Sequence, residues 1–346
     1  MPENITTNHR ATIDDVARYA GVSIATVSRV VNTTGQVAQS TRERVFDAIA
    51  ALNYTPHAAA KGLASRRTNT LGLIVSEISG AFFQPMLKGI EAGVRAYGYD
   101  LLIHSTPRDH QGHASRYPLG EYNTDGLLIF TNSLNEAEIT RLYQTGLPMV
   151  LLYRAPPPGL EIPTITFENK SGARKLVDYL IEQRGKRRIA FLRGPQENED
   201  SYWRELGYRD SMAAHGITVD ESLIGDGEFD EYIARRIVNE WIKQNLTLDA
   251  IFAGDDESAL GAYAALNENQ IRIPQDIAVV GFDDIPIARY LSPPLTTVHV
   301  PIEMTGCVAV DQLMRLIRGG NADLLTLLPT ELVIRRSCGN KESATP

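Results

Sequence analysis

The spacing of hydrophobic residues changes once along the chain, near residue 70. Before that point, apolar residues recur every three or four positions in three short stretches, the first with Ile13, Val16, Ala17 and Ala20 on one face. After it, short apolar runs alternate with longer amphipathic stretches, which is the order typical of parallel sheets covered by helices. The pattern predicts an all-α head followed by an α/β body.

Short polar residues predict where the helices of the head begin. Thr12 and Ser23 precede the first two helices, where their oxygens can accept from the unpaired N–H groups of the first turn. Gly21 lies between these helices, at a turn that needs a permissive backbone. The run Ser-Thr-Arg-Glu at 40–43 matches a capping box and predicts that a third helix opens there. This layout is typical of a helix-turn-helix.

The body predicts at least thirteen alternating elements. The expected strands are 70–76, 99–105, 125–130, 148–153, 188–194, 250–254 and 277–283. The expected helices are 82–97, 136–145, 171–183, 202–215, 231–244 and 257–267. These are more elements than one sheet accommodates comfortably, so we expect two similar lobes. Residues 108–122 fit neither period and stay unassigned, and 339–346 are expected to form a frayed tail.

Composition is ordinary for a soluble globular protein. The chain of 346 residues is 43% hydrophobic and 22% charged, and no apolar run approaches the length of a membrane span. The N-terminus lacks the basic-then-apolar layout of a signal peptide, so we expect a cytoplasmic protein. Cys307 and Cys338 provide neither a disulfide framework nor the spacing of a metal site.

Charge is distributed unevenly between head and body. Residues 1–68 hold eight basic and five acidic side chains, a net charge of +3, whereas the whole chain carries −8. The rest of the chain therefore carries −11. A basic head on an acidic body suits a protein in which one small region contacts phosphate.

The sequence lacks the short motifs of common enzyme classes. It contains no GxSxG, no GxxxxGKS or GxxxxGKT, and no HExxH. His104, His110 and His113 form its only near-cluster of histidines, which a solvated loop explains better than a metal site. We expect a protein that is not an enzyme and that binds no metal or cofactor.

The second predicted helix carries residues suited to reading DNA. A helix presented by its N-terminal end fits the major groove, where the base edges are distinguishable. Arg29 can donate two hydrogen bonds to a guanine, which is the commonest specific contact. Short polar groups suited to phosphate oxygens are found at Thr12, Thr26, Ser28 and Asn32.

The run TIDDVARYAGVSIATVSRVVN, from Thr12 to Asn32, resembles the head of the LacI/GalR family of bacterial repressors. The match continues through TRERV at 41–45 and LNYTP at 52–56. The resemblance implies that Ile24, Ala25 and Arg29 face base edges. Because Ile24 and Ala25 are apolar, they would favour contact with thymine methyl groups.

Residues 56–65 resemble the hinge helix of this family, which orders on DNA and enters the minor groove. Leu63 stands where the family inserts a leucine between base steps, and Ala60 lies in the same segment. Such wedges act in pairs about a two-fold axis. The resemblance thus implies a homodimer on a near-palindromic double-stranded DNA operator, and it leaves a tetramer open.

The rest of the chain resembles the family's effector-binding core, which is itself similar to periplasmic sugar-binding proteins. The implied division is a head at 1–55, a hinge and linker at 56–69, a core at 70–338 and the tail. Within the core we expect one lobe at about 70–166 and 300–327 and another at about 168–297 and 328–338. The effector is expected between the lobes, at the carboxyl ends of the strands.

Seven residues are candidates for contact with the effector. Arg204 suits vicinal hydroxyls or a carboxylate, Asp283 can accept two hydroxyl protons, and Asp255 stands where the family more often has asparagine. The other four candidates are Tyr153 and Arg154, at a strand end, and Phe82 and Phe229, which offer apolar ring faces. For each one, a helix cap or a salt bridge between the lobes is the alternative.

Other aromatic residues near these positions are expected to pack rather than bind. Phe83, Trp203 and Trp241 are assigned to the core, and Gly80-Ala81 stands where the family has Asn-Pro. A sugar or polyol is the expected effector, while the acid-rich cleft leaves a cationic or nucleobase-like one open. We expect the effector to control DNA affinity; the sign of its effect stays open. A periplasmic-type solute-binding protein without DNA function is the alternative, although it would carry no helix-turn-helix.

Overall fold

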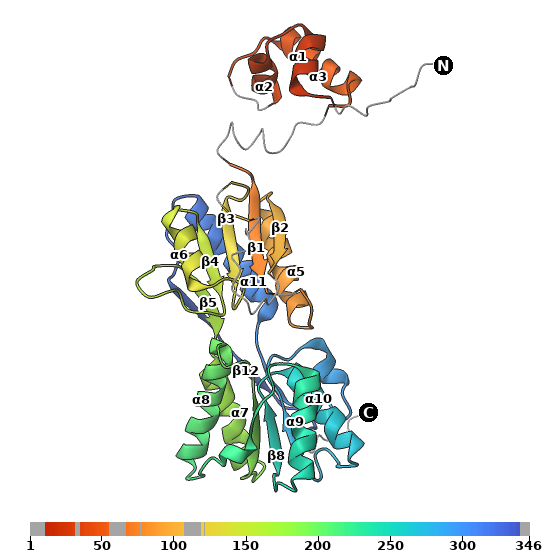
Figure 1. Cartoon of the computed structure of the whole chain (residues 1–346), viewed down its shortest axis with the longest axis vertical. Coiled ribbons are helices and arrows are strands. Elements are labelled where there is room, and N and C mark those ends of the chain that lie inside the picture. The colour runs from red at the N-terminus through yellow and green to blue at the C-terminus, as the bar shows by residue number, and fades with distance from the viewer. Residues whose placement is uncertain are drawn as a thin grey trace, which may run out of the picture. The chain divides into compact units, whose positions relative to one another are not determined.

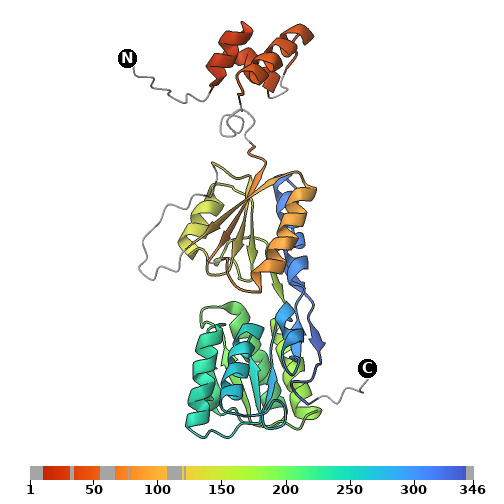
Figure 2. The same cartoon turned by 90° about the vertical axis from the view of Figure 1, so that its right-hand side faces the viewer.

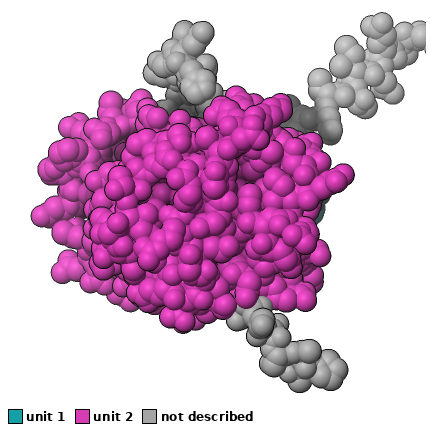
Figure 3. Space-filling view, turned by 90° about the horizontal axis from the view of Figure 1, so that it is seen from below, with its two compact units in different colours: residues 1–68 teal, residues 69–346 magenta. Residues whose placement is uncertain are grey.

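The computed structural model describes residues 11–31, 35–54, 67–76, 78–106, 119–120 and 122–339. The chain divides into two compact units, residues 1–68 and residues 69–346 (Figure 1). Figure 3 shows the surface of the second unit. Within the described residues, no helix has both the length and the apolar character needed to cross a membrane.

The first unit is a bundle of three helices, α1 (Ile13–Ala20), α2 (Ile24–Val31) and α3 (Gln39–Ala51). Gly21 ends α1 with a left-handed backbone, at a φ of +62°, which L side chains rarely adopt. Val16, Val27 and Val45 are fully buried and form the centre of the small core. The expected helix-turn-helix is therefore confirmed.

Helix starts in this unit were predicted with mixed success. Thr12 and Asp15 form a capping box at α1, and the Ser23 hydroxyl accepts from Thr26 N at 3.2 Å. The capping box expected at 40–43 is wrong, because α3 begins at Gln39 after Ala38, which makes no side-chain cap. The Glu43 side chain is instead bonded to the Gln39 side chain on the first turn.

The N-lobe of the second unit contains a parallel sheet of six strands in the order β11-β5-β4-β3-β1-β2. The strands are β1 (Thr70–Val75), β2 (Asp100–Ser105), β3 (Gly126–Phe130), β4 (Met149–Leu152), β5 (Thr164–Phe167) and β11 (Leu325–Leu328). Alternate residues of β1 pack on opposite faces, so Leu73 joins the core under α5 (Phe83–Ala96) and α11 (Ile302–Ile317). Ile74 joins the core under α6 (Glu136–Gln144).

Helices α5 and α11 cross closely, as Figure 2 shows on one side of this sheet. Glycines make the approach possible. A Cβ on Gly306 would lie 2.5 Å from the backbone oxygen of Met86, and one on Gly89 would lie 2.0 Å from that of Glu303. A larger residue at either position would force the helices apart.

The C-lobe contains a parallel sheet of four strands in the order β7-β6-β8-β9. These are β6 (Ile189–Arg193), β7 (Ile224–Asp226), β8 (Ala250–Ala253) and β9 (Ala278–Val280). One face is covered by α7 (Asn169–Glu182) and α8 (Glu199–Ala214), and the other by α9 (Glu231–Lys243) and α10 (Asp256–Glu268) (Figure 1). Phe191 faces the first pair, with its ring stacked on Tyr208 at 5.2 Å, while Leu192 faces the second.

The chain passes between the lobes three times: from β5 to α7, from β10 (Thr297–His299) to α11, and from β11 to β12 (Glu331–Val333). Strands β10 and β12 pair antiparallel to each other. A 3₁₀ helix, η1 (Glu221–Leu223), precedes β7, and another, η2 (Pro286–Tyr290), precedes β10. The expected two-lobed α/β fold with parallel sheets is confirmed.

Candidate functional sites

The exposed face of α2 is the candidate DNA-reading surface. Ile24 is 46% exposed, and Ala25 and Arg29 are also exposed, while Val27 and Val30 on the opposite face are buried. This division follows from helical periodicity, because residues 25 and 29 lie about one turn apart with residue 24 beside them, whereas residues 27 and 30 lie on the opposite side. The three side chains that the resemblance assigns to base edges thus share a free surface of the unit.

The polar residues expected to contact phosphates are not all free on the surface of the unit. The Thr12 hydroxyl donates to Asp15 Oδ2 at 2.7 Å, and the Thr26 hydroxyl lies 2.9 Å from that of Ser23, so both take part in helix capping. Ser28 is half-buried. The other three predicted DNA contacts, Asn32, Ala60 and Leu63, lie outside the described residues.

A cavity of about 290 Å³ opens between the lobes of the second unit. Side chains at the carboxyl ends of β1, β3, β4, β8 and β9 line it, which is where open α/β sheets bind ligands. Six of the seven predicted effector residues are among them: Phe82, Tyr153, Arg204, Phe229, Asp255 and Asp283. The seventh, Arg154, does not line the cavity; its guanidinium donates to the Leu134 carbonyl at 2.8 Å.

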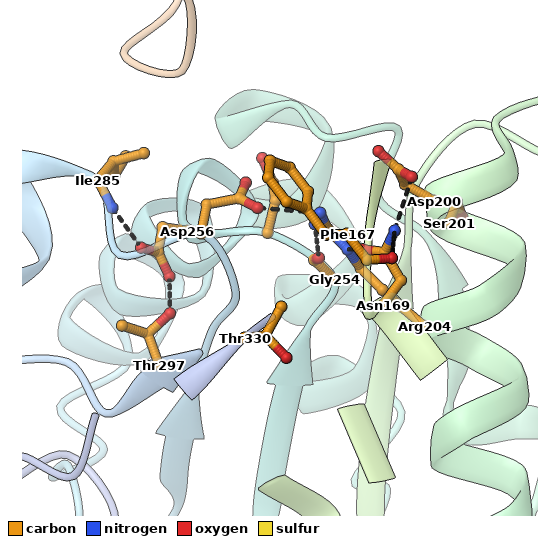
Figure 4. A network of polar contacts seen from close by, with 12 residues as sticks. Phe167, Asn169, Asp200, Ser201, Arg204, Gly254, Asp256, Ile285, Thr297 and Thr330 are labelled. Atoms are coloured by element: carbon orange, nitrogen blue, oxygen red, sulfur yellow. Dashed lines mark hydrogen bonds and ion pairs between the residues drawn. The ribbon is translucent and has the colours of Figure 1, made fainter. Parts of the chain in front are cut away.

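Arg204 is the centre of a buried polar network at the cavity floor (Figure 4). Its Nε donates to Asn169 Oδ1 at 2.9 Å, its Nη1 to the Gly254 carbonyl at 2.7 Å and its Nη2 to Asp283 Oδ1 at 2.9 Å. Asn169 in turn donates to Asp200 Oδ1 at 2.7 Å. Three nitrogens of the arginine are therefore engaged within the protein, which fixes its orientation.

Two aromatic rings pack against this arginine. The guanidinium carbon lies 4.0 Å from the ring centre of Phe282 and 5.5 Å from that of Phe229. Phe229 in turn lies against bare backbone, since a Cβ on Gly194 would lie 2.3 Å from its ring. The glycine is thus required by the position of the aromatic ring.

Carboxylates surround the network. The pKa of Asp283 is raised to about 8, chiefly by burial; Arg204 lowers it, and the nearby Asp255 and Asp200 raise it. Burial also raises the pKa of Asp255 and of Asp200, and it raises that of Asp256 well above its ordinary value. The cavity floor therefore holds more acidic groups than its cations can neutralise.

Five non-glycine cavity residues have a positive φ, which L residues rarely adopt. The values are +56° for Asn132, +61° for Tyr153, +58° for Glu228, +56° for Phe229 and +107° for Asp283. Non-glycine residues adopt such values at a cost of about 1–3 kcal/mol each, and they concentrate where a side chain has to be aimed at a ligand.

Several polar residues of the site could not be identified from the sequence pattern. Asp256 accepts from the Thr297 hydroxyl at 2.6 Å and from Ile285 N at 2.9 Å, which ties α10 to the loop after β9 (Figure 4). Glu257 accepts from Ala81 N of the other lobe at 2.8 Å. Asp256 gains its partners only when the C-lobe is folded, and Glu257 only when the two lobes meet.

One of the three packing assignments differs from the structure. Trp241 is 5% exposed and packs in the C-lobe core as expected. Trp203 is 42% exposed, with its ring edge-on to Tyr202 at 5.1 Å, so its assignment to the core is wrong. Phe83 is 7% exposed and also lines the cavity.

A helix-turn-helix followed by a two-lobed core with a polar cavity defines a class of protein, the DNA-binding regulators that respond to a small molecule. The model of the lacI family of bacterial regulatory proteins matches residues 12–57, and that of a periplasmic binding protein-like domain matches residues 177–338. The HTH-type transcriptional regulator GalS of Salmonella typhimurium is 36% identical over 303 residues, which are 87% of this chain and 88% of that protein.

Solved structures agree with these matches. The lac repressor dimer bound to operator and the anti-inducer ONPF has a TM-score of 0.79 at 27% identity and covers 95% of this chain and 99% of that one. The transcriptional regulator CelR–cellobiose complex has a TM-score of 0.70 at 31% identity, with 95% and 100% covered. The chain belongs to the LacI family of bacterial regulatory proteins and is a DNA-binding transcriptional regulator.

Proposed function

We propose that this regulator is a repressor that binds a near-palindromic operator as a homodimer and whose DNA affinity is controlled by a sugar-like ligand in the cavity. It acts in the cytoplasm and has no enzymatic activity. The observation that carries the sugar proposal is the cavity lining, in which Arg204, Asp255 and Asp283 can bond hydroxyls beside the rings of Phe82 and Phe229.

The similar CelR structure holds cellobiose, which supports a carbohydrate as the ligand class. Control follows from linkage. A ligand changes DNA affinity only by as much as it distinguishes the DNA-competent state from the incompetent one, typically 1–3 kcal/mol.

Exposed apolar residues support the homodimer. Leu102 and Ile103 are each 42% exposed on β2, the edge strand of the N-lobe sheet, and Tyr290 of η2 is 76% exposed. Apolar side chains on an open sheet edge favour association with a second chain. The solved lac repressor structure with operator is a dimer.

The experiment combines DNA binding with a ligand panel. Fluorescence anisotropy with genomic fragments should find one preferred site, with an affinity that falls steeply with salt and changes when the bound sugar is added. Arg29→Ala should relax discrimination at one base pair, at a cost of about 1–3 kcal/mol. Arg18→Ala is the matched control, because Arg18 is an exposed arginine of the same unit, on α1.

Arg18→Ala should weaken binding to all fragments alike. Equal affinity of the purified chain for every fragment would contradict the role in DNA recognition. A preferred operator whose affinity no sugar changes would contradict the carbohydrate part alone.

A further inference from the structure

The charge of the cavity wall limits which ligands it accepts. Six carboxylates and a single basic group line it among the described residues. The basic group is Arg204, and the acids are Asp200, Glu228, Asp230, Asp255, Glu257 and Asp283. A neutral ligand would leave this excess of negative charge uncompensated.

The partial positive charges of helix N-termini do not neutralise this excess of negative charge. Helices α5, α8, α9 and α10 begin at cavity residues, and their N-termini together contribute about two positive charges. Counting Arg204 as well, about three of the six negative charges remain uncompensated. Burial raises the pKa of Asp283, and a cation beside it would favour the ionised carboxylate.

The opposite wall is aromatic and faces the same space. Phe82, Phe83, Phe130 and Tyr153 line the cavity from the N-lobe, and the Tyr153 ring lies 5.5 Å from that of Phe82 and 5.3 Å from that of Phe130. The faces of such rings attract cations, and they also stack on the apolar faces of sugar rings.

Two of the acids that line the cavity, Asp200 and Asp283, have oxygens available. Asp200 Oδ1 accepts from Asn169 and Thr166, and Asp283 Oδ1 from Arg204. For both residues, the described part of the chain shows no hydrogen bond to Oδ2. The cavity thus offers two carboxylate oxygens that can accept from a ligand.

We propose that the effector is a sugar ring that carries a protonated amine, an amino sugar of the hexosamine class. That the ligand is a sugar rests on the proposed function. That it carries an amine is inferred from the excess of carboxylates in the cavity wall. The ammonium group bonds Asp200 Oδ2 and Asp283 Oδ2, and the ring stacks on the aromatic wall.

The test is isothermal titration of the full-length chain with matched sugars. Glucosamine, galactosamine and mannosamine are each compared with the parent hexose and with the N-acetyl derivative, which keeps the ring and removes the charge. At least one amino sugar should bind about tenfold or more tightly than both of its neutral partners. Its advantage should shrink as salt is added.

Two variants localise the effect. Asp200→Asn keeps the shape and removes one charge, and it should lower the preference for the amine about tenfold. Glu228→Gln, half-buried at the cavity wall, should lower that preference too and serves as the test if Asp200→Asn does not fold. Glu161→Gln removes an exposed carboxylate away from the cavity and should leave the preference unchanged.

The outcomes separate this proposal from the proposed function. Neutral hexoses or disaccharides that bind as tightly as the amino sugars would overturn the amine and leave a sugar-responsive regulator. Absence of binding by every sugar, charged or neutral, would overturn both the amine and the carbohydrate class.

Discussion

Two hydrogen bonds connect the lobes, and each can be removed by a single substitution. Glu257 Oε1 accepts from Ala81 N and Glu199 Oε1 accepts from Ala155 N, each at 2.8 Å. In both pairs, a carboxylate near the N-terminus of a C-lobe helix bonds a backbone amide of the N-lobe. We predict that Glu257→Ala shifts the lobes toward an open arrangement.

The size of the shift follows from the kind of bond. A hydrogen bond to a charged group contributes about 1.5–3 kcal/mol, and the lower end applies here because the pair is only partly buried. The ratio of closed to open lobes should fall about tenfold in Glu257→Ala. Glu199→Ala should act independently, so the double variant should show the product of the two effects.

Hydrogen exchange followed by mass spectrometry measures this without knowledge of the ligand. A peptide covering residues 78–83 should exchange about tenfold faster in Glu257→Ala, because the Ala81 amide loses its acceptor. The control is Glu240→Ala, which removes a surface partner of Arg236 and should change nothing. An exchange rate within twofold of the unmodified chain would refute a role for Glu257 in holding the lobes.

Three further predictions follow from contacts within the core. Asp283→Asn should flatten the pH dependence of stability. In the folded chain the pKa of about 8 exceeds the ordinary 3.8, so this group's stabilisation is complete below pH 3.8 and is lost as pH rises through 8. Urea denaturation at pH 5, 7 and 9 should therefore show a steeper decline for the unmodified chain. Gly194→Ala should displace the Phe229 ring, which lies 2.3 Å from the added carbon, and should weaken ligand binding in calorimetry by about 1–3 kcal/mol. Gly306→Ala should separate α5 from α11 and lower the free energy of unfolding in urea by about 1–3 kcal/mol. An unchanged free energy of unfolding would contradict the need for a glycine at this crossing.

Local signals explain which parts of the fold could be predicted. Thr12, Gly21 and Ser23 act on their own helices, so the sequence alone located the head. The long apolar runs of β1, β3 and β8 are buried on both faces, so they were found as well. Strands of three or four residues with polar positions, such as β7, β10 and β12, have too short a pattern to distinguish from loops.

The site was predictable only where a residue ends a strand. Tyr153 and Asp283 follow β4 and β9 and line the cavity. Arg154 was predicted to line the cavity and does not, because successive side chains at a strand end point in opposite directions and the Tyr153 side chain takes the inward one. Asp200 and Glu257 lie in the first turns of helices, and only the meeting of the two lobes gives them partners across the cavity.

Asp283 also joins the cavity to the path of the chain between the lobes. Its backbone N donates to the Val298 carbonyl at 2.8 Å, and its carbonyl accepts from Val300 N at 3.4 Å. Residues 297–300 lead directly from β10 into α11, the helix that packs on the N-lobe sheet. Under the proposed function, a ligand that bonds the Asp283 side chain would therefore act directly on a segment that joins the lobes. We expect such a ligand to distinguish open from closed lobes without a separate relay, because the residue that binds it is also bonded to that segment.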